Sequence, residues 1–194
     1  MEGMFKFDSN ITSLDLSTFD TSKVTTMKSM FTDCKTLTTL DLSSFNTSNV
    51  TNFTNMFLGF NEPMALTSIV GLDKFNTSKA TDMSNMFYYD SNLTALNLSS
   101  FDTSNVTSMD SMFYRCTSLT TLDVSSFNTS NVTNFSFMFA SFSTPMSLTS
   151  IVGLDKFNTS KVTDMSNMFQ EEANLTTLDL SSFNMSNVTN SNSM

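Results

Sequence analysis

The stretch SSFNTSNVTNFTNMF, residues 43–57, contains the pattern that decides the fold. Serine, threonine and asparagine dominate it, and these residues favour caps and turns over the interiors of helices and strands. Large apolar residues nevertheless occur at fixed places, at Phe45, Val50, Phe53, Met56 and Phe57. A polar, turn-forming segment with apolar residues in register indicates a structure in which neighbouring copies share one core.

The phrase F-[ND]-T-S recurs down the chain, with F-N-M-S as its last copy. Its seven phenylalanines lie 26 or 30 residues apart: Phe19, Phe45, Phe75, Phe101, Phe127, Phe157 and Phe183. A longer period of 82 residues relates Phe19 to Phe101 and Phe101 to Phe183. The two longer intervals contain insertions within residues 60–74 and 141–156, which indicates that a three-repeat unit has been duplicated.

Each repeat carries an L-x-x-L-x-L segment, such as Leu37, Leu40 and Leu42, whose last step has the two-residue period of a strand. One such unit is too small to bury its apolar residues alone, whereas stacked units form a continuous core. The sequence therefore predicts a repeat solenoid, mainly parallel β and low in helix. We expect strands over 37–42, 93–98 and 119–124, and a second ladder through 50–53 and its copies. At most one helical or 3₁₀ turn is expected per repeat, at T-x-M-x-x-M-F.

Composition excludes several classes of protein. The chain is 39% hydrophobic and 12% aromatic, which is too aromatic for intrinsic disorder. A net charge of −9 argues against nucleic acid or an anionic membrane as partner. No run of 18 apolar residues predicts a membrane span. Because the chain has no histidine, Ser-His and Cys-His pairs and histidine metal sites are excluded, and we expect no enzyme, metal or cofactor.

The remaining reactive groups favour structural roles. Cys34 and Cys116 are three coils apart, roughly 14 Å at the spacing of strands, which is beyond the ~7 Å limit for a disulfide. We expect both to be small core or edge residues. The adjacent carboxylates Glu171 and Glu172 are interpreted as a solvated loop and not as an acid–base pair.

The phrase LTTLDLSSFNTSNVTNFTNMF, with a cysteine three residues after phenylalanine in two copies, resembles the 26-residue repeat of bacterial BspA-like surface proteins. The resemblance covers essentially the whole chain. It implies a leucine-rich-repeat fold carried outside a bacterial cell, in a group associated with adhesion to host proteins or surfaces. Two departures are that most positions equivalent to Cys34 lack cysteine, and that no export or anchoring signal is present in these residues.

Three features are candidates for binding. The insertions are expected to project as loops from one face, with exposed tips at Phe60, Pro63, Met64, Phe142, Pro145 and Met146, although duplication alone would also explain their likeness. A row of outward carboxylates on the parallel strands could bind cations or basic partners, or simply keep the face soluble; its members are Asp15, Asp41, Asp123 and Asp179. A threonine ladder from Thr25 to Thr189 could bind ice, although hydrogen-bonded turns are the more common cause.

Two classes of function follow. The first is an adhesion or binding module for an extracellular protein or glycan. The second is a self-assembling element, because both ends lie in the same repeat register without polar caps. Such ends either stack head to tail into fibres or belong to a fragment of a longer array. The residues expected in that contact are Phe5, Ile11, Leu14, Leu16, Leu178, Leu180, Phe183 and Val188. The single predicted domain spans residues 1–194 and contains about seven repeats.

Overall fold

The computed structural model describes all residues, 1–194, and its regular elements are short. The strands are β1 (Thr39–Asp41), β2 (Ser68–Val70), β3 (Thr121–Asp123) and β4 (Ser150–Val152). Two 3₁₀ helices, η1 (Leu72–Lys74) and η2 (Leu154–Lys156), follow β2 and β4. There is no α-helix, so the prediction of low helix content is confirmed. No helix has the length and apolar character needed to cross a membrane.

The strands pair in parallel, β1 with β2 and β3 with β4. The predicted strands over 37–42 and 119–124 are confirmed at their centres, although each is only three residues long. The predicted strand over 93–98 is wrong, because these residues form no strand. On both sides of this segment a serine hydroxyl bonds the neighbouring carbonyl, Ser100 Oγ to Leu72 O at 3.0 Å and Ser126 Oγ to Leu98 O at 3.1 Å.

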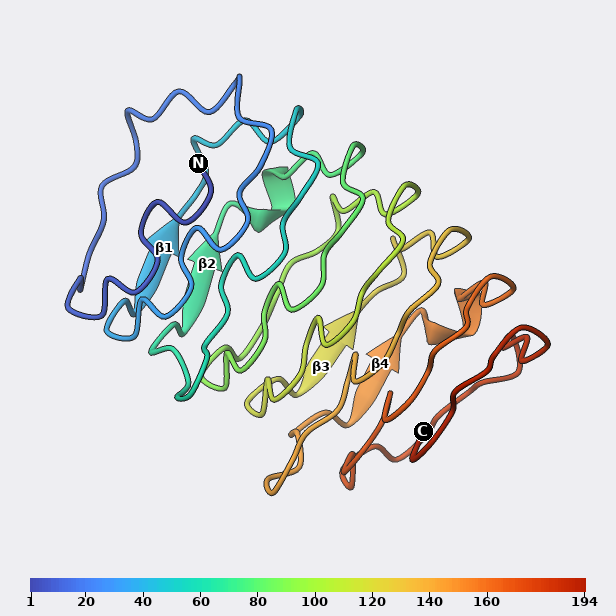
Figure 1. The fold of residues 1–194 in the computed structure, drawn as a ribbon. Coiled ribbons are helices and arrows are strands. Elements are labelled where there is room, and N and C mark those ends of the chain that lie inside the picture. Colours follow the sequence, from blue (N-terminus) through green and yellow to red (C-terminus); the bar gives the residue numbers. More distant parts are fainter.

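A second ladder of parallel bridges runs the length of the molecule. It joins residues at intervals of 26 or 30: Thr26, Asn52, Asp82, Ser108, Asn134, Asp164 and Asn190. This confirms the ladder predicted through 50–53. We call the segment between successive bridge residues a coil, and the coils lie side by side from the blue to the red end of the chain (Figure 1).

The core is one contiguous cluster of 44 buried residues. Its centre is a phenylalanine stack with one ring from each coil, in the order Phe5, Phe31, Phe57, Phe87, Phe113, Phe139 and Phe169. Successive ring centroids are 5.5 to 5.9 Å apart, with nearly parallel planes. Buried methionines such as Met56 and Met86 fill the space beside the stack. These methionines therefore belong to the core.

The serine- and asparagine-rich composition is explained by a recurring turn. An aspartate or asparagine oxygen accepts the backbone N–H of the residue two positions later, as in Asp41 with Ser43 at 2.9 Å and Asn46 with Ser48 at 3.0 Å. Short polar side chains at these positions hold the backbone in a bend without any partner from elsewhere. This confirms that the polar residues form the turns.

The threonine of F-[ND]-T-S joins each coil to the next. Thr47 is buried, its hydroxyl donates to Asn76 O at 3.0 Å, and its oxygen accepts the Asn76 N–H at 2.8 Å. The same exchange links Thr21 to Asn46. A hydroxyl is the smallest side chain that both donates and accepts, so one threonine satisfies two buried backbone groups.

The Met-Phe segment forms isolated turns and no helix, within the expected limit of one helical or 3₁₀ turn per repeat. N–H groups alternate between partners: those of Met27, Ser29 and Phe31 bond carbonyls of the next coil, whereas those of Met30 and Thr32 bond the carbonyl three residues back. Ser29 and its equivalents have positive φ, which interrupts any helix. The 3₁₀ helices instead follow the inserted coils' strands.

Gly71 joins β2 to η1 in a backbone conformation with φ of +91°. A Cβ at this position would lie 2.6 Å from Ser43 N and 2.7 Å from Ser43 Cα. We expect Gly71→Ala to lower the free energy of unfolding by about 1–3 kcal/mol or more, from backbone strain and displacement of the adjacent coil. Urea unfolding measures the loss, and Gly3→Ala is the matched control because its Cβ meets nothing nearer than 3.7 Å. Equal losses in the two variants would show that the close approach at Gly71 is unimportant.

Candidate binding edge

We define the Met-Phe edge as the corners that follow each Met-Phe pair: residues 6–10, 32–36, 58–65, 88–92, 114–118, 140–147 and 170–174. These corners follow one another along the lower side of the molecule in Figure 1. Both insertions occur here, so the edge departs from the regular outline twice.

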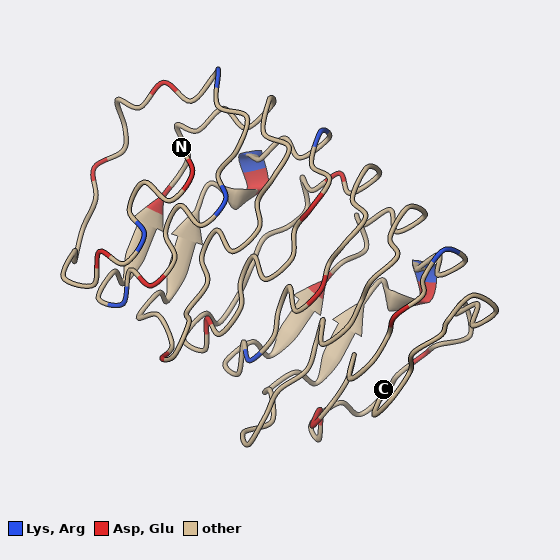
Figure 2. Ribbon diagram, in the orientation of Figure 1, with Lys and Arg blue, Asp and Glu red and all other residues tan.

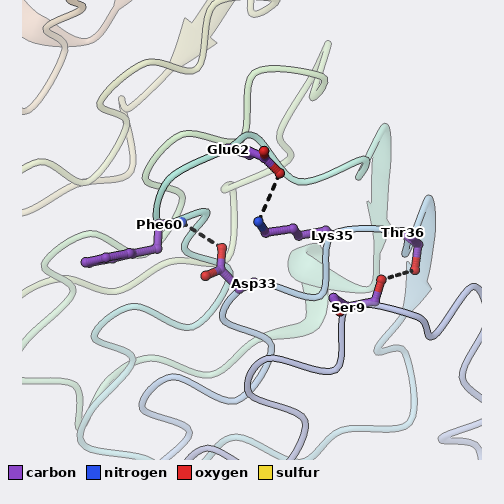
Figure 3. A network of polar contacts seen from close by, with 6 residues as sticks. All are labelled: Ser9, Asp33, Lys35, Thr36, Phe60 and Glu62. Carbon is purple, nitrogen blue, oxygen red and sulfur yellow. Dashed lines mark hydrogen bonds and ion pairs between the residues drawn. The ribbon is translucent and has the colours of Figure 1, made fainter.

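The first insertion is held by polar contacts on its inner side. Asp33 Oδ1 accepts the Phe60 N–H at 2.8 Å, and Lys35 Nζ lies 2.9 Å from Glu62 Oε2. Figure 3 shows the Phe60 ring pointing away from both contacts. The ring is 63% exposed, although the side chain is large and apolar. The loop therefore holds Phe60 in solvent by bonding its backbone, which confirms the predicted exposure.

Phe60 forms one wall of a shallow cleft of about 300 Å³. The cleft is lined by Lys6, Phe7, Thr32, Asn55, Leu58 and Phe60. Phe7 is also largely exposed, and the Lys6 ammonium lies 4.9 Å from its ring centroid. The cleft thus offers two aromatic rings and one cation to a ligand.

The prediction that Met64 and Met146 are exposed is wrong, because both are fully buried in the core. In each loop, only the residues that precede the methionine project into solvent. The chain then turns inward, so that the methionine side chain lies in the core. The amide of Asn92 fixes this point by donating to Met64 O at 2.7 Å, and Asn174 does the same for Met146. Pro63 is half-buried and Pro145 is exposed.

The second insertion presents Phe142 in the same way but is held by other contacts. Phe142 is 56% exposed. The next residue, Ser143, donates its backbone N–H to Glu171 Oε2 at 2.8 Å, and the Ser141 hydroxyl bonds Thr144 O. The Asp33 and Lys35 contacts of the first loop have no counterpart, because Arg115 and Thr117 stand at the equivalent positions 82 residues later. The two loops share the backbone bonds at their bases, Gly59 N–H to Tyr88 O and Ser141 N–H to Gln170 O, and differ in the side-chain bonds at their tips.

The carboxylate row lies on the face of the short strands, as expected. Asp15, Asp41, Asp123 and Asp179 are all exposed. Each accepts bonds from the serine two residues later, and the serine hydroxyl and backbone bonds hold the pKa of each carboxyl below its usual range. The row is interrupted by exposed Val70 and Val152. These carboxylates thus have a structural use in the turns, whether or not they also meet a partner.

The residues expected to mediate self-association differ in exposure. Leu178 is 41% exposed, and the half-buried members are Phe5, Ile11, Leu14, Leu180, Phe183 and Val188. Leu16 is only 2% exposed, so its expected availability is wrong, because the following coil covers it and Ser44 Oγ bonds its carbonyl. Self-association through this set stays a prediction.

The threonine ladder from Thr25 to Thr189 is exposed, and its hydroxyls bond within the protein. Thr51 Oγ1 donates to Thr25 O at 3.2 Å, and Thr107 Oγ1 donates to Thr81 O at 3.1 Å. The hydroxyl protons are therefore directed along the ladder. This supports the interpretation as a hydrogen-bonded turn ladder.

The two cysteines are free and buried, in agreement with the core role. The Sγ of Cys34 donates to Phe5 O and that of Cys116 to Phe87 O, each at 3.0 Å. Burial, followed by the nearby Asp8, raises the pKa of the Cys34 thiol to about 12. Such a thiol remains protonated and unreactive at neutral pH.

Three acids occupy the cysteine position in other coils: Asp8, which is exposed, and Asp90 and Glu172. Asp90 is fully buried, and neither of its carboxyl oxygens has a hydrogen-bond partner. Burial holds the pKa of Asp90 far above its usual range and raises the pKa of Glu172 to about 8. The carboxyl oxygens of Glu172 are also buried without partners, so the interpretation of Glu172 as solvated is wrong, whereas Glu171 is exposed. The chain packs Glu172 against the second insertion, which covers it.

Sequence reasoning missed a cluster of aromatic and basic side chains between the two insertions. All three tyrosines and the single arginine lie at Tyr88, Tyr89, Tyr114 and Arg115. The Tyr88 and Tyr114 rings stack at 4.8 Å, and the Arg115 guanidinium lies 4.1 Å from the centre of the Tyr89 ring. The concentration of these rare residues within two corners was the signal that could have indicated the cluster.

The geometry therefore defines a mainly-β repeat chain with exposed aromatic loops on one edge. The family model described as "Mycoplasma protein of unknown function, DUF285" matches residues 1–65, 60–151 and 142–194. These matches together cover the whole chain, and the chain belongs to this family. No curated protein and no solved structure matches it significantly.

Proposed function

We propose that the chain is a leucine-rich-repeat-like solenoid that acts outside a bacterial cell as a non-enzymatic binding module for a host protein. The coils bonded at intervals of 26 and 30 residues support the solenoid. The family relationship supports a bacterial repeat protein, and the resemblance to BspA-like repeats favours the cell surface.

The Met-Phe edge is the proposed binding surface. The observation that carries this choice is the matched exposure of Phe60 and Phe142, at 63% and 56%, whereas the phenylalanines of the central stack from Phe31 to Phe139 are fully buried. Exposing a large ring costs free energy that a folded chain normally recovers by burial. The two loops share the bonds at their bases but hold the equivalent ring in solvent through different side-chain bonds at their tips, which favours selection for contact with a partner. Aromatic anchors of this kind dominate the binding energy of protein interfaces.

The charge distribution favours a protein ligand over a membrane or nucleic acid. Acidic residues outnumber basic ones by 18 to 9. Figure 2 shows the charges dispersed along the ribbon, without a continuous basic patch. Phosphate backbones and anionic lipids require such a patch. An aromatic edge with scattered charges is instead typical of contacts between proteins.

The proposal predicts that the double variant Phe60→Ser and Phe142→Ser binds cultured epithelial monolayers at least about tenfold more weakly than the parent chain, since two aromatic anchors are lost. Fluorescently labelled protein and a titration of bound fluorescence provide the measurement. Both rings lie outside the core, so the far-ultraviolet circular dichroism and the unfolding temperature are expected to stay unchanged.

Met185→Thr is the matched control for the loop variant. Met185 is 43% exposed but lies outside the Met-Phe edge, and the substitution restores the F-N-T-S phrase. Its binding is expected to equal that of the parent chain. Binding that survives both the double phenylalanine variant and an Asp41→Ala, Asp123→Ala variant contradicts the placement of the site on either face.

A further inference from the structure

We infer that the cluster of Tyr88, Tyr89, Tyr114 and Arg115, which we call the Tyr-Arg ledge, receives a carboxylate side chain of a protein partner. The inference rests on the proposed binding function and names the chemistry of the ligand. It places the carboxylate on the guanidinium of Arg115, beside the second insertion.

The composition of the ledge singles it out on the molecule. The chain contains three tyrosines, no tryptophan and one arginine, and these four residues fall on two successive corners of the Met-Phe edge. Tyrosine and arginine are enriched among the residues that carry binding energy at protein interfaces. The repeat consensus has no aromatic or arginine here, since the corresponding residues of the first complete corner are Thr32 and Asp33.

Arg115 is oriented but has no anionic partner. The only ion pair within 4.0 Å joins Lys35 to Glu62, so no carboxylate of this chain pairs with the guanidinium. Its sole side-chain hydrogen bond is a long one, from Nη2 to Phe142 O at 3.4 Å. The Tyr89 ring supports the guanidinium from one side at 4.1 Å. The remaining N–H groups are thus available to donate to a carboxylate, whose two oxygens match the fork of a guanidinium.

The surroundings of Arg115 favour an anion, even though the chain is acidic overall. Glu171 lies on the following corner, and its Oε2 already accepts the Ser143 N–H at 2.8 Å. Burial raises the pKa of Tyr88 and of Tyr114, so their hydroxyls remain neutral donors. A carboxylate on Arg115 therefore meets hydrogen-bond donors beside the positive charge.

The stacking of the rings favours a peptide side chain over an acidic sugar. Tyr88 and Tyr114 cover one another at 4.8 Å, and the Phe137 ring meets Tyr114 edge-on at 5.9 Å. One face of Tyr89 is covered by Arg115. A sugar ring binds by lying on an open aromatic face, whereas a Glu or Asp side chain needs only the guanidinium and the hydroxyl edges. The ledge offers the second kind of contact.

The test uses the full chain and an array of acetylated and amidated heptapeptides with a central glutamate, each paired with its glutamine twin. We expect a subset of peptides bearing Glu to bind at least about tenfold more strongly than their twins at low salt, and this difference to shrink as salt rises. Arg115→Ala removes the difference, and Arg115→Lys retains part of it because the charge remains without the planar fork.

Lys161→Ala is the control, since Lys161 is an exposed cation whose Nζ bonds Asn131 Oδ1 at 2.6 Å away from the ledge. Equal binding of every peptide pair, discrimination that survives in Arg115→Ala, or binding of sialyllactose without any glutamate peptide would each overturn the inference. The epithelial assay separates it from the proposed function. If the double phenylalanine variant loses cell binding while Arg115→Ala binds cells fully, the proposed function is supported and the inferred role of the ledge is contradicted.

Discussion

Phe113→Ala is expected to lower the free energy of unfolding by about 3–5 kcal/mol, the usual range for removing a fully buried phenylalanine. The Phe113 ring is 0% exposed and lies between Phe87 at 5.7 Å and Phe139 at 5.9 Å. Its removal leaves a cavity between two rings that the flanking coils cannot close, because their bridges fix the spacing. Urea unfolding monitored by circular dichroism measures the loss.

Phe5→Ala is the matched comparison, since Phe5 belongs to the same stack but is half-buried and has only Phe31 as a neighbour within it, at 5.5 Å. Its loss is expected to be clearly smaller. If Phe113→Ala cost less than about 1 kcal/mol, the phenylalanine stack would not be the main source of stability.

Stability is expected to fall as the pH rises from 5 to 8, and Asp90→Asn is expected to remove much of this dependence. The pKa of Asp90 is raised in the folded chain by burial, so the folded state binds a proton that the unfolded state releases above about pH 4. The contribution of the protonated Asp90 carboxyl to the free energy of unfolding is therefore fully present below its unfolded pKa and is lost as the pH rises through its folded pKa. The slope for one such group approaches about 1.4 kcal/mol per pH unit.

The window of pH 5–8 separates the two buried carboxyls, Asp90 and Glu172, from the other titrations, and the Asp90→Asn variant separates one from the other. The aspartates with lowered pKa, such as Asp41 and Asp123, stabilise the fold above their unfolded pKa and affect stability only at more acidic pH. The Cys116 thiol faces Asp90 from the next coil and ionises in the unfolded chain only above pH 8 or so. Glu172→Gln is measured alongside, because the pKa of Glu172 is raised to about 8 by burial. A flat profile for the parent chain, or the same slope in Asp90→Asn, would show that the Asp90 carboxyl is solvated.

The parallel ladders and the core could be predicted because they depend on what successive repeats share. A phenylalanine recurring at 26 or 30 residues must lie beside its copy once the coils stack, so the sequence contained the Phe31 to Phe169 stack in full. Strand length could not be predicted in this way. Residues 93–98 form no strand although their apolar pattern matches that of 37–42, so the apolar pattern does not determine where regular pairing occurs.

The binding edge was predictable only where it departs from the repeat by insertion. Phe60 and Phe142 were expected to be exposed because extra residues must leave the coil. Met64 and Met146 were misplaced because the position at which the chain re-enters the core depends on the side-chain bonds of Asn92 and Asn174, from another coil. The Tyr-Arg ledge consists of residues that differ from the repeat consensus in single copies. A comparison that looks for positions shared by all repeats does not detect them.

The position three residues after the stacked phenylalanine has a consequence for how such a gene changes. Along the coils it holds Asp8, Cys34 and Phe60, then Asp90, Cys116 and Phe142, so acid, thiol and aromatic recur as a set with the 82-residue period. The residues that lie next to Asp90 and Cys116 on adjacent coils therefore recur together with them in each 82-residue unit. Unequal crossing-over between the two near-identical gene segments would add or delete one whole set, and every coil would still meet a compatible neighbour. The molecule can thus vary in reach, and in its number of exposed aromatic loops, by genetic recombination without selection for new contacts.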